Sequence, residues 1–272
     1  MDHGISVPSA TPLTVSKRLR RGVNTSATVL LPLVTLGLVL GAWWAATTFT
    51  DIRSILLPSP GSVLEELRNR PEYLATHARV TLVETLVGFG LTTVGGILIG
   101  TLIAASRTLS RMVSPWLVAL NAVPKVALAP LLVLWLGWEL EMRVGMVVLM
   151  CFFPVVLATT TGLLSTPNEL SELARSLDAP RWRTFILVRF PHALPQIFVG
   201  LKVAMPLAVV GAVLGEFRGR DGLGQVITVS STGNTTLAFA ALLVVSVLSV
   251  ALYYALVLLE RLALPWVRHT TS

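Results

Sequence analysis

Charged residues are scarce in this sequence. Asp, Glu, Lys and Arg make up 13% of its 272 residues, about half of the roughly 25% that is usual in soluble domains. Hydrophobic residues make up 54%, and the mean hydropathy is +0.76. This balance argues against an ordinary soluble domain and predicts an all-α integral membrane protein with several spanning helices.

The residue types that build metal, redox and nucleotide sites are also few. The single cysteine, Cys151, lies in an apolar run, which excludes a disulfide framework and a thiolate metal cluster. The four histidines are scattered, without the paired spacing of a zinc site. No Gly-rich P-loop of the Walker type is present, so we expect the chain neither to hydrolyse ATP nor to bind a cofactor.

Both ends of the chain are polar. We expect residues 1–24 to form a disordered cytoplasmic tail, because this stretch is polar and ends in four basic residues. The apolar run 27–48 that follows is too long for a signal peptide and matches a full membrane span. Residues 261–272 are expected to form a second cytoplasmic tail. Basic residues at span ends account for the net charge of +7 without nucleic acid.

Apolar runs of about 20 residues predict about six transmembrane helices. Residues 49–79 form an extracytoplasmic connector, in which Val63, Leu64 and Leu67 have helical spacing. This connector helix lies either at the membrane surface or packed on the bundle. Residues 80–260 form the core. The six expected spans are 27–48, 80–106, 112–136, 144–165, 193–215 and 235–259.

The loops between the spans predict the orientation. With the N-terminus inside, the cytoplasmic side holds twelve Lys and Arg residues and the outer side holds seven. Basic residues concentrate on the cytoplasmic side of membrane proteins. We therefore expect both termini to be cytoplasmic, and the polar segment 166–191 to face the cytoplasm.

Segment 166–195 is the longest polar stretch between apolar spans and predicts two short helices. Thr166, Pro167 and Glu169 fit an N-cap with a capping box. Pro180 predicts a break between the helices, and Pro191 predicts the end of the second one. A short amphipathic pair cannot bury both of its faces alone, so it needs a protein partner or the membrane surface.

This segment resembles the cytoplasmic coupling loop of permease subunits of bacterial ABC importers. That loop reads Glu-Ala-Ala, three residues, Gly, nine residues, Ile, one residue, Leu-Pro. Here Glu172-Leu173-Ala174 matches the triplet and Phe190-Pro191 the final pair, while Asp178 stands in place of Gly. The resemblance implies that a separate ATPase contacts this loop. The implied coupling residues are Glu169, Glu172, Leu173, Ala174, Leu177, Asp178, Ala179, Pro180, Arg181 and Trp182.

Further motifs resemble the nitrate, taurine and alkanesulfonate branch of that family. They include Leu57-Pro58-Ser59-Pro60, Trp135-Leu136-Gly137 and Gly222-Leu223-Gly224, and the likeness covers roughly residues 57 to 266. It implies a type I importer permease in the bacterial inner membrane, a homodimer that works with ATPase subunits using ATP and Mg and with an extracytoplasmic solute-binding protein. The cargo it implies is a small anionic or polar organic solute, similar to a sulfonate, taurine or nitrate. The branch also includes permeases for thiamine precursors and riboflavin, so membership does not fix the cargo.

Prolines and charges inside the spans mark a candidate translocation pathway. Pro124 and Pro206 would interrupt the third and fifth spans, as broken helices do in transporters, or would be packing kinks. Lys125 and Lys202 lie near mid-membrane. Each attracts an anionic solute, or snorkels, or pairs with Glu84, or caps carbonyls freed by Pro124. The candidate pathway residues are Asn121, Pro124, Lys125, Lys202 and Pro206.

At the outer side, Glu84 is compatible with a gate, a lipid-facing side chain or a pair with Arg79. Glu216 and Arg218 belong to an outer loop that either contacts the receptor or is simply solvated. An alternative function is a stand-alone secondary transporter or channel. That class predicts an internal inverted repeat or several midplane carboxylates, and the sequence has neither.

Overall fold

The computed structural model describes residues 25–137 and 139–265, and within them all regular structure is helical. The predicted disordered tail 1–24 lies outside the described residues, as do residues 266–272 of the predicted C-terminal tail 261–272. The first residues of that tail, 261–263, belong to the last helix, which continues to Ala263. The chain divides into two compact units, residues 1–51 and residues 52–272.

The described part of the first unit forms one helix, α1 (Thr25–Phe49), and its part Leu30–Phe49 is long and apolar enough to span a membrane. The hydroxyl group of Thr35 donates to the carbonyl of Leu31, and that of Thr47 to the carbonyl of Trp43. These polar side chains therefore have partners within the helix. The helix agrees with the predicted span 27–48.

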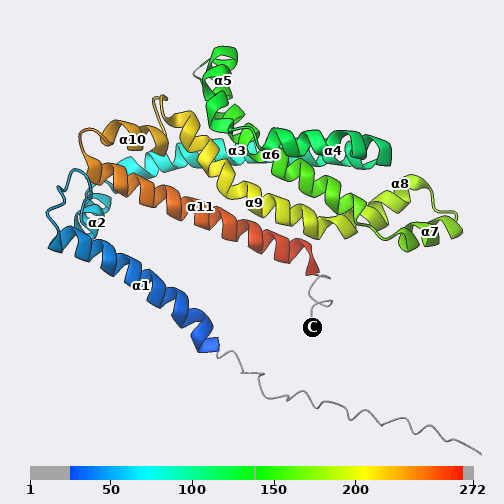
Figure 1. Ribbon diagram of the computed structural model, residues 1–272, viewed down its shortest axis with the longest axis horizontal. Coiled ribbons are helices and arrows are strands. Elements are labelled where there is room, and N and C mark those ends of the chain that lie inside the picture. Colours follow the sequence, from blue (N-terminus) through cyan, green and yellow to red (C-terminus); the bar gives the residue numbers. More distant parts are fainter. Residues whose placement is uncertain (1–24, 138, 266–272) are drawn as a thin grey trace, which may run out of the picture. The chain divides into compact units, whose positions relative to one another are not determined.

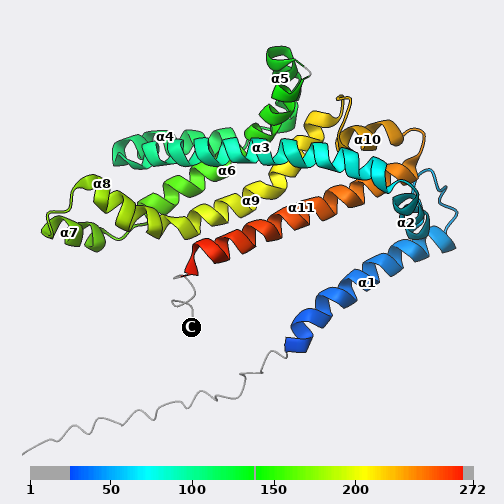
Figure 2. The ribbon, with the colours of Figure 1, turned by 180° about the vertical axis from the view of Figure 1, so that it is seen from behind.

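The second unit is a bundle in which four long helices run side by side (Figures 1 and 2). They are α3 (Pro71–Ala104), α6 (Leu140–Leu164), α9 (Phe190–Glu216) and α11 (Thr235–Ala263). The shorter elements are α2 (Pro60–Asn69), α4 (Arg107–Asn121), the 3-10 turn η1 (Lys125–Leu128), α5 (Ala129–Leu136), α7 (Asn168–Ser176), α8 (Arg181–Thr184), the π-helical turn η2 (Phe185–Arg189) and α10 (Leu223–Ser230). Helices α7 and α8 lie at one end of the bundle and α10 at the other.

Helix α6 is the centre of this unit and packs against both α3 and α9. Glycines on α3 meet it at helical spacing, since a Cβ atom on Gly96 would clash with Val155 and one on Gly100 with Thr159. Gly200 of α9 lies equally close to Ala158. Small residues allow helix backbones to approach closely, which is how helices associate where lipid replaces water.

The predicted number of spans agrees with the structure. Within the described residues, five helices are long and apolar enough to cross a membrane, and the pair α4 with η1–α5, bent by 84°, would make a sixth. The third span is therefore broken where Pro124 predicted a break. Pro206 does not interrupt α9, so that prediction was wrong. The packing of α9 along α6 holds this helix together although one backbone hydrogen bond is lost.

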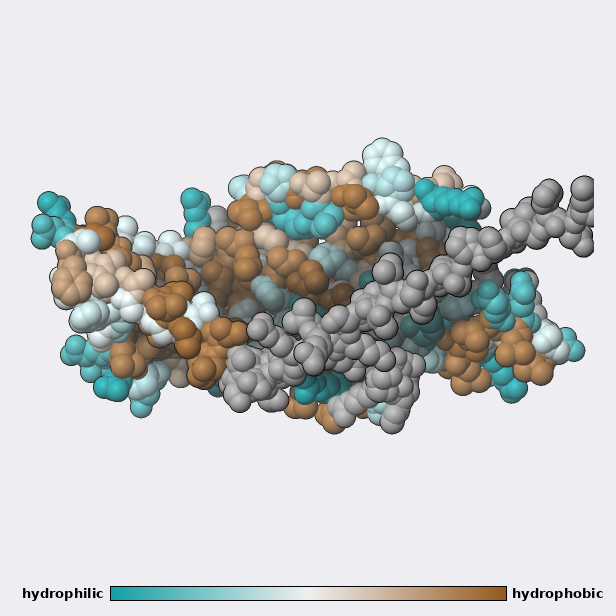
Figure 3. Space-filling view, turned by 60° about the horizontal axis from the view of Figure 1, so that its bottom comes forward, coloured by the Kyte–Doolittle hydropathy of each residue, from teal (hydrophilic) through white to brown (hydrophobic). Residues whose placement is uncertain are grey.

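The surface of the bundle is rich in exposed apolar side chains, as Figure 3 shows for one face. Leu91 and Leu98 of α3 and Val247 of α11 are among the exposed residues. A soluble protein rarely leaves so much apolar surface uncovered, so this surface fits a lipid environment.

The connector helix α2 packs on the bundle. Ser59 caps its first turn by accepting a hydrogen bond from the amide of Ser62 at 3.2 Å, and Val63 is buried. The helix lies against α11, and Asn234 donates to Glu66 across the two elements at 3.3 Å. Of the two alternatives for this helix, the packed connector agrees with the structure.

Candidate functional site

The loop after α7 turns sharply at Asp178. Its φ of 51° lies in the left-handed region, and among the described residues no other non-glycine has a positive φ. The amide of Ala179 donates to the carbonyl of Ala174 at 3.0 Å, which is the long bond of a Schellman motif. Asp178 therefore adopts the conformation for which the related loop uses Gly.

Helix α7 begins at Asn168, and the hydroxyl group of Thr166 donates to the carbonyl of Leu163, at the end of α6. One local prediction for this segment was wrong. The second helix does not end at Pro191, because α8 continues through η2 into α9. A π-helical turn widens the backbone just before Pro191, which makes room for a residue that lacks an N–H donor.

Apolar side chains of this segment point away from the protein. Leu173 is 58% exposed, Leu177 74% and Trp182 60%. Ala174 is buried, whereas Glu169 and Glu172 are exposed. The segment thus presents large hydrophobic side chains that no described residue covers.

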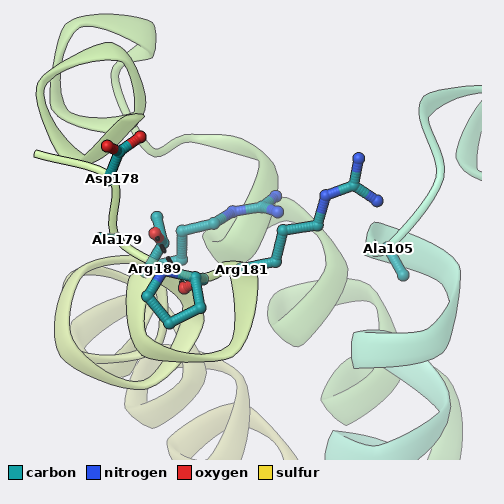
Figure 4. A pocket seen from close by; sticks show the side chains of 7 residues that line it. Ala105, Asp178, Ala179, Arg181 and Arg189 are labelled. Carbon is teal, nitrogen blue, oxygen red and sulfur yellow. Dashed lines mark hydrogen bonds between the residues drawn. The ribbon is translucent and has the colours of Figure 1, made fainter. Parts of the chain in front are cut away.

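A cavity of about 730 Å³ lies between this loop and the end of α3 (Figure 4). Arg181 and Arg189 extend into it from α8 and η2, while the carboxylate of Asp178 points elsewhere. Arg189 also donates to the carbonyl of Leu163 at 3.3 Å. The lining residues are Ala105, Asp178, Ala179, Pro180, Arg181, Thr184 and Arg189.

At the broken third span, Lys125 caps the end of α4. Its Nζ atom donates to the backbone oxygen and to the side-chain Oδ1 of Asn121, both at 3.0 Å. It also lies 5.6 Å from the ring centroid of Phe153. Among the alternatives for Lys125, capping of carbonyls freed near Pro124 agrees with this geometry.

Lys202 is paired across two helices. Its Nζ atom lies 2.8 and 2.9 Å from the carboxylate oxygens of Glu260 on α11. The pair with Glu84 that we considered is therefore not formed. The pairing of Lys202 with Glu260 was not predicted, because the two residues lie far apart in the chain.

Glu84 is buried toward the α10 end of the bundle, with 2% exposure. Its Oε1 atom lies 2.6 Å from Nη1 of Arg143 on α6, so its partner is not Arg79. A lipid-facing Glu84 is excluded by this burial.

Glu216 is fully buried, with 0% exposure, so the expectation of a receptor contact through this side chain was wrong. Its Oε2 atom accepts a hydrogen bond from the amide of Gly224 at 2.6 Å. Gly222 has a φ of 98°, and a Cβ atom on it would overlap Glu216. This positive φ and close approach explain why the motif Gly222-Leu223-Gly224 has glycine at position 222.

The same turn is fixed to α3. The amide of Gly222 donates to Nδ1 of His77 at 3.0 Å, and the amide of Leu223 to the hydroxyl oxygen of Thr81 at 2.9 Å. Arg218 and Asp221 remain exposed beside it. Within the described residues, no group of three His, Cys, Asp or Glu side chains is placed to hold a metal ion.

Comparison with known proteins places these features in context. Residues 96–265 match the family model described as the inner membrane component of binding-protein-dependent transport systems. A probable ABC transporter permease protein of Haemophilus influenzae is 36% identical over 84% of this chain and 94% of that protein. The riboflavin transport system permease protein RibX of Chloroflexus aurantiacus is 37% identical over 86% and 88%.

The taurine transport system permease protein TauC of Escherichia coli is 28% identical over 92% of this chain and 94% of that protein. Among solved structures, an inward-facing form of the MetNI methionine ABC transporter superimposes with a TM-score of 0.61 at 21% identity. It covers 70% of this chain and 95% of the other. The likeness to MetNI bears on the fold alone.

Proposed function

Because this chain belongs to the family of inner membrane components of binding-protein-dependent transport systems and is a permease subunit of an ABC importer, we propose that α7 and α8 form the loop through which a separate ATPase drives transport. The exposed Leu173, Leu177 and Trp182 carry this proposal. Burying apolar surface on association is favourable, and a groove on the ATPase would cover these side chains. ATP would bind to that partner, not to this chain.

We place α7 and α8 on the cytoplasmic side, with both termini inside. The excess of basic residues on that side of the predicted topology supports this orientation. The ends of α9 and α10 then face the extracytoplasmic solute-binding protein. Arg218 is exposed beside them, on the side that we assign to that protein.

We propose that two copies of the chain enclose the pathway along the broken third span. Leu134 is 76% exposed and Trp135 69% exposed on α5, which leaves the bent half of this span without a covering partner. A second copy would cover it. Broken helices near mid-membrane line pathways in transporters, and Asn121, Pro124 and Lys125 lie at this break.

The cargo that fits these observations is a small polar or anionic organic solute. Lys125 makes no ion pair with a carboxylate in the described part of the chain, so its charge is available to an anionic group. The charge of Lys202 is already neutralised by Glu260. The similar permeases include ones named for riboflavin and for taurine, so the class stays broad.

Purification in mild detergent from native membranes, with mass spectrometry of the partners, tests the coupling role. We expect an ATPase subunit to accompany the wild-type chain and to be lost from Leu177→Gln. Leu262→Gln is the matched control, because Leu262 is equally exposed at 74% but lies on α11. A chain that purifies alone and transports solute without ATP would instead support a secondary transporter.

A further inference from the structure

The cavity beside the coupling loop has two chemically different parts. The larger part, of about 730 Å³, is lined by the Arg181 and Arg189 side chains and by Thr184. A second cavity of about 260 Å³ shares both arginines and Ala105, and is otherwise lined by Thr101, Ala104, Leu163 and Phe185. A polar space therefore continues into a mainly apolar one at the end of the α3 and α6 spans.

The positive charge in this cavity lacks an internal counterion. Within the described residues, neither Arg181 nor Arg189 makes a salt bridge to a carboxylate. Among the described residues that line the cavity, Asp178 alone is acidic, and its carboxylate points away from the two guanidinium groups. Two guanidinium groups extending into one cavity form a ready site for a phosphate group, which arginine binds through paired hydrogen bonds.

We propose that this cavity binds an anionic phospholipid, with the phosphate between Arg181 and Arg189 and an acyl chain running from the apolar cavity along α3. Basic pockets between spanning helices at the cytoplasmic surface are typical sites for anionic headgroups. Leu102, one turn before Ala105 on α3, is 66% exposed and continues the apolar path toward lipid. A soluble anion would make no use of the apolar part.

The proposed lipid site lies on the face of the coupling loop toward the spanning helices, opposite the face that we assign to the ATPase. It rests on the proposed function only in that the lipid is assigned to the cytoplasmic leaflet. Helix α3 is a span that packs against α6. A bound lipid would hold α8, which belongs to the coupling loop, against the end of α3. Lipid composition would thereby influence how firmly the loop is positioned for coupling.

The test uses the full chain, purified with the subunits that accompany it and placed in nanodiscs of mixed phosphatidylcholine and phosphatidylglycerol. Native mass spectrometry then measures the phosphatidylglycerol retained. We expect Arg181→Gln to retain roughly fivefold less than wild type, the effect of one basic residue near a lipid surface. Arg189→Gln should lower retention similarly, and thermal unfolding checks that this variant still folds.

Arg183→Gln is the matched control. Arg183 belongs to the same α8 turn, but it does not line the cavity and lies over the Trp182 ring, 5.3 Å from its centroid. Its variant should retain lipid like wild type. Equal loss from Arg181→Gln and Arg183→Gln would indicate general basic attraction and overturn the site.

Two further outcomes also overturn it. If inorganic phosphate raises the melting temperature of delipidated wild type and displaces phosphatidylglycerol, the cavity is a soluble-anion site. If Arg181→Gln loses the ATPase but keeps its lipid, the arginine serves ATPase docking. That last result would overturn the lipid site but not the proposed coupling role. The experiment therefore distinguishes failure of the lipid site from failure of the coupling role.

Discussion

Two buried acidic side chains, Glu84 and Glu216, connect elements at the α10 end of the second unit. Glu84 pairs with Arg143, and Glu216 holds the turn at Gly224. Removing one partner of a buried ion pair leaves an uncompensated charge, whereas replacing both partners with apolar residues of similar volume is often tolerated. The ion pair of Glu84 with Arg143 thus connects α3 to α6, and its contribution to the free energy of unfolding depends on both residues being present.

We expect Arg143→Met to destabilise the protein by about 3–5 kcal/mol, because Glu84 would then be buried without a partner. The double variant Glu84→Leu with Arg143→Met should recover most of this loss. Thermal unfolding in detergent measures both, with the exposed Arg79→Met as control. A double variant as unstable as the single one would contradict the assignment of Glu84 as the main partner.

Backbone conformation at Asp178 gives a second prediction. Gly adopts a positive φ with less strain than other residues, so Asp178→Gly should stabilise the loop by about 0.5–1 kcal/mol. Glu172→Gly, inside helical α7, should cost about 1 kcal/mol instead. Opposite shifts of the melting temperature would support the left-handed turn. A decrease for both variants would argue against it.

Sequence spacing predicted the position of this turn but not the partners of the buried charges. The family-like spacing placed a Gly-type turn at Asp178, because turn geometry is local in the chain. Arg143 was counted among loop residues, and Glu260 was not recognised as the partner of Lys202. Ion pairs between distant residues depend on which helices lie side by side, and a single sequence does not contain that information directly.

At the scale of elements, two prolines show how tertiary packing changes the local effect of proline on a helix. Pro124 accompanies a real break, since α4 ends at Asn121 and the chain turns by 84° into α5. Pro206 sits in a continuous α9. The difference lies in packing, because α9 is buried along α6 whereas no comparable neighbour covers α5. Proline alone therefore predicts a weak point in a helix, and packing decides whether it breaks.

The broken span also yields a prediction about cargo. Lys125→Met should raise the KM for uptake of an anionic solute about tenfold, as expected for the loss of a charge-assisted interaction. Lys202→Met, whose charge is paired with Glu260, should leave KM unchanged while lowering stability. Uptake measured in reconstituted vesicles decides between them. An unchanged KM in Lys125→Met would restrict this residue to capping α4.

For the whole molecule, composition and run length were sufficient to predict a helical membrane protein with about six spans. The motif at 172–191 was sufficient to predict its family. The second short helix was mispredicted, because the continuity of α8 with α9 depends on a π-helical turn, for which the sequence has no simple signal. The exposed hydrophobic surface fits contact with both lipid and partner subunits. Much of the apolar surface of this chain would therefore be buried by lipid or by partners, and not by the chain itself.

Orientation is a property of the whole molecule, and the chain is well suited to test it. Its single cysteine, Cys151, is buried and donates to the carbonyl of Ala204, so background labelling should be low. Ser176 and Ser231 are both exposed, and each hydroxyl group donates to a carbonyl three residues earlier, at 2.8 and 2.7 Å. They form a matched pair on opposite predicted sides.

We expect a membrane-impermeant maleimide to label Ser231→Cys in intact cells and Ser176→Cys only after the membrane is permeabilised. The physical reason is the excess of basic residues on the side that holds Ser176. Labelling is measured by mass shift of the purified chain, with wild type as the blank. The reverse pattern would place α7 outside, away from any cytoplasmic ATPase, and would overturn the coupling role of its exposed leucines.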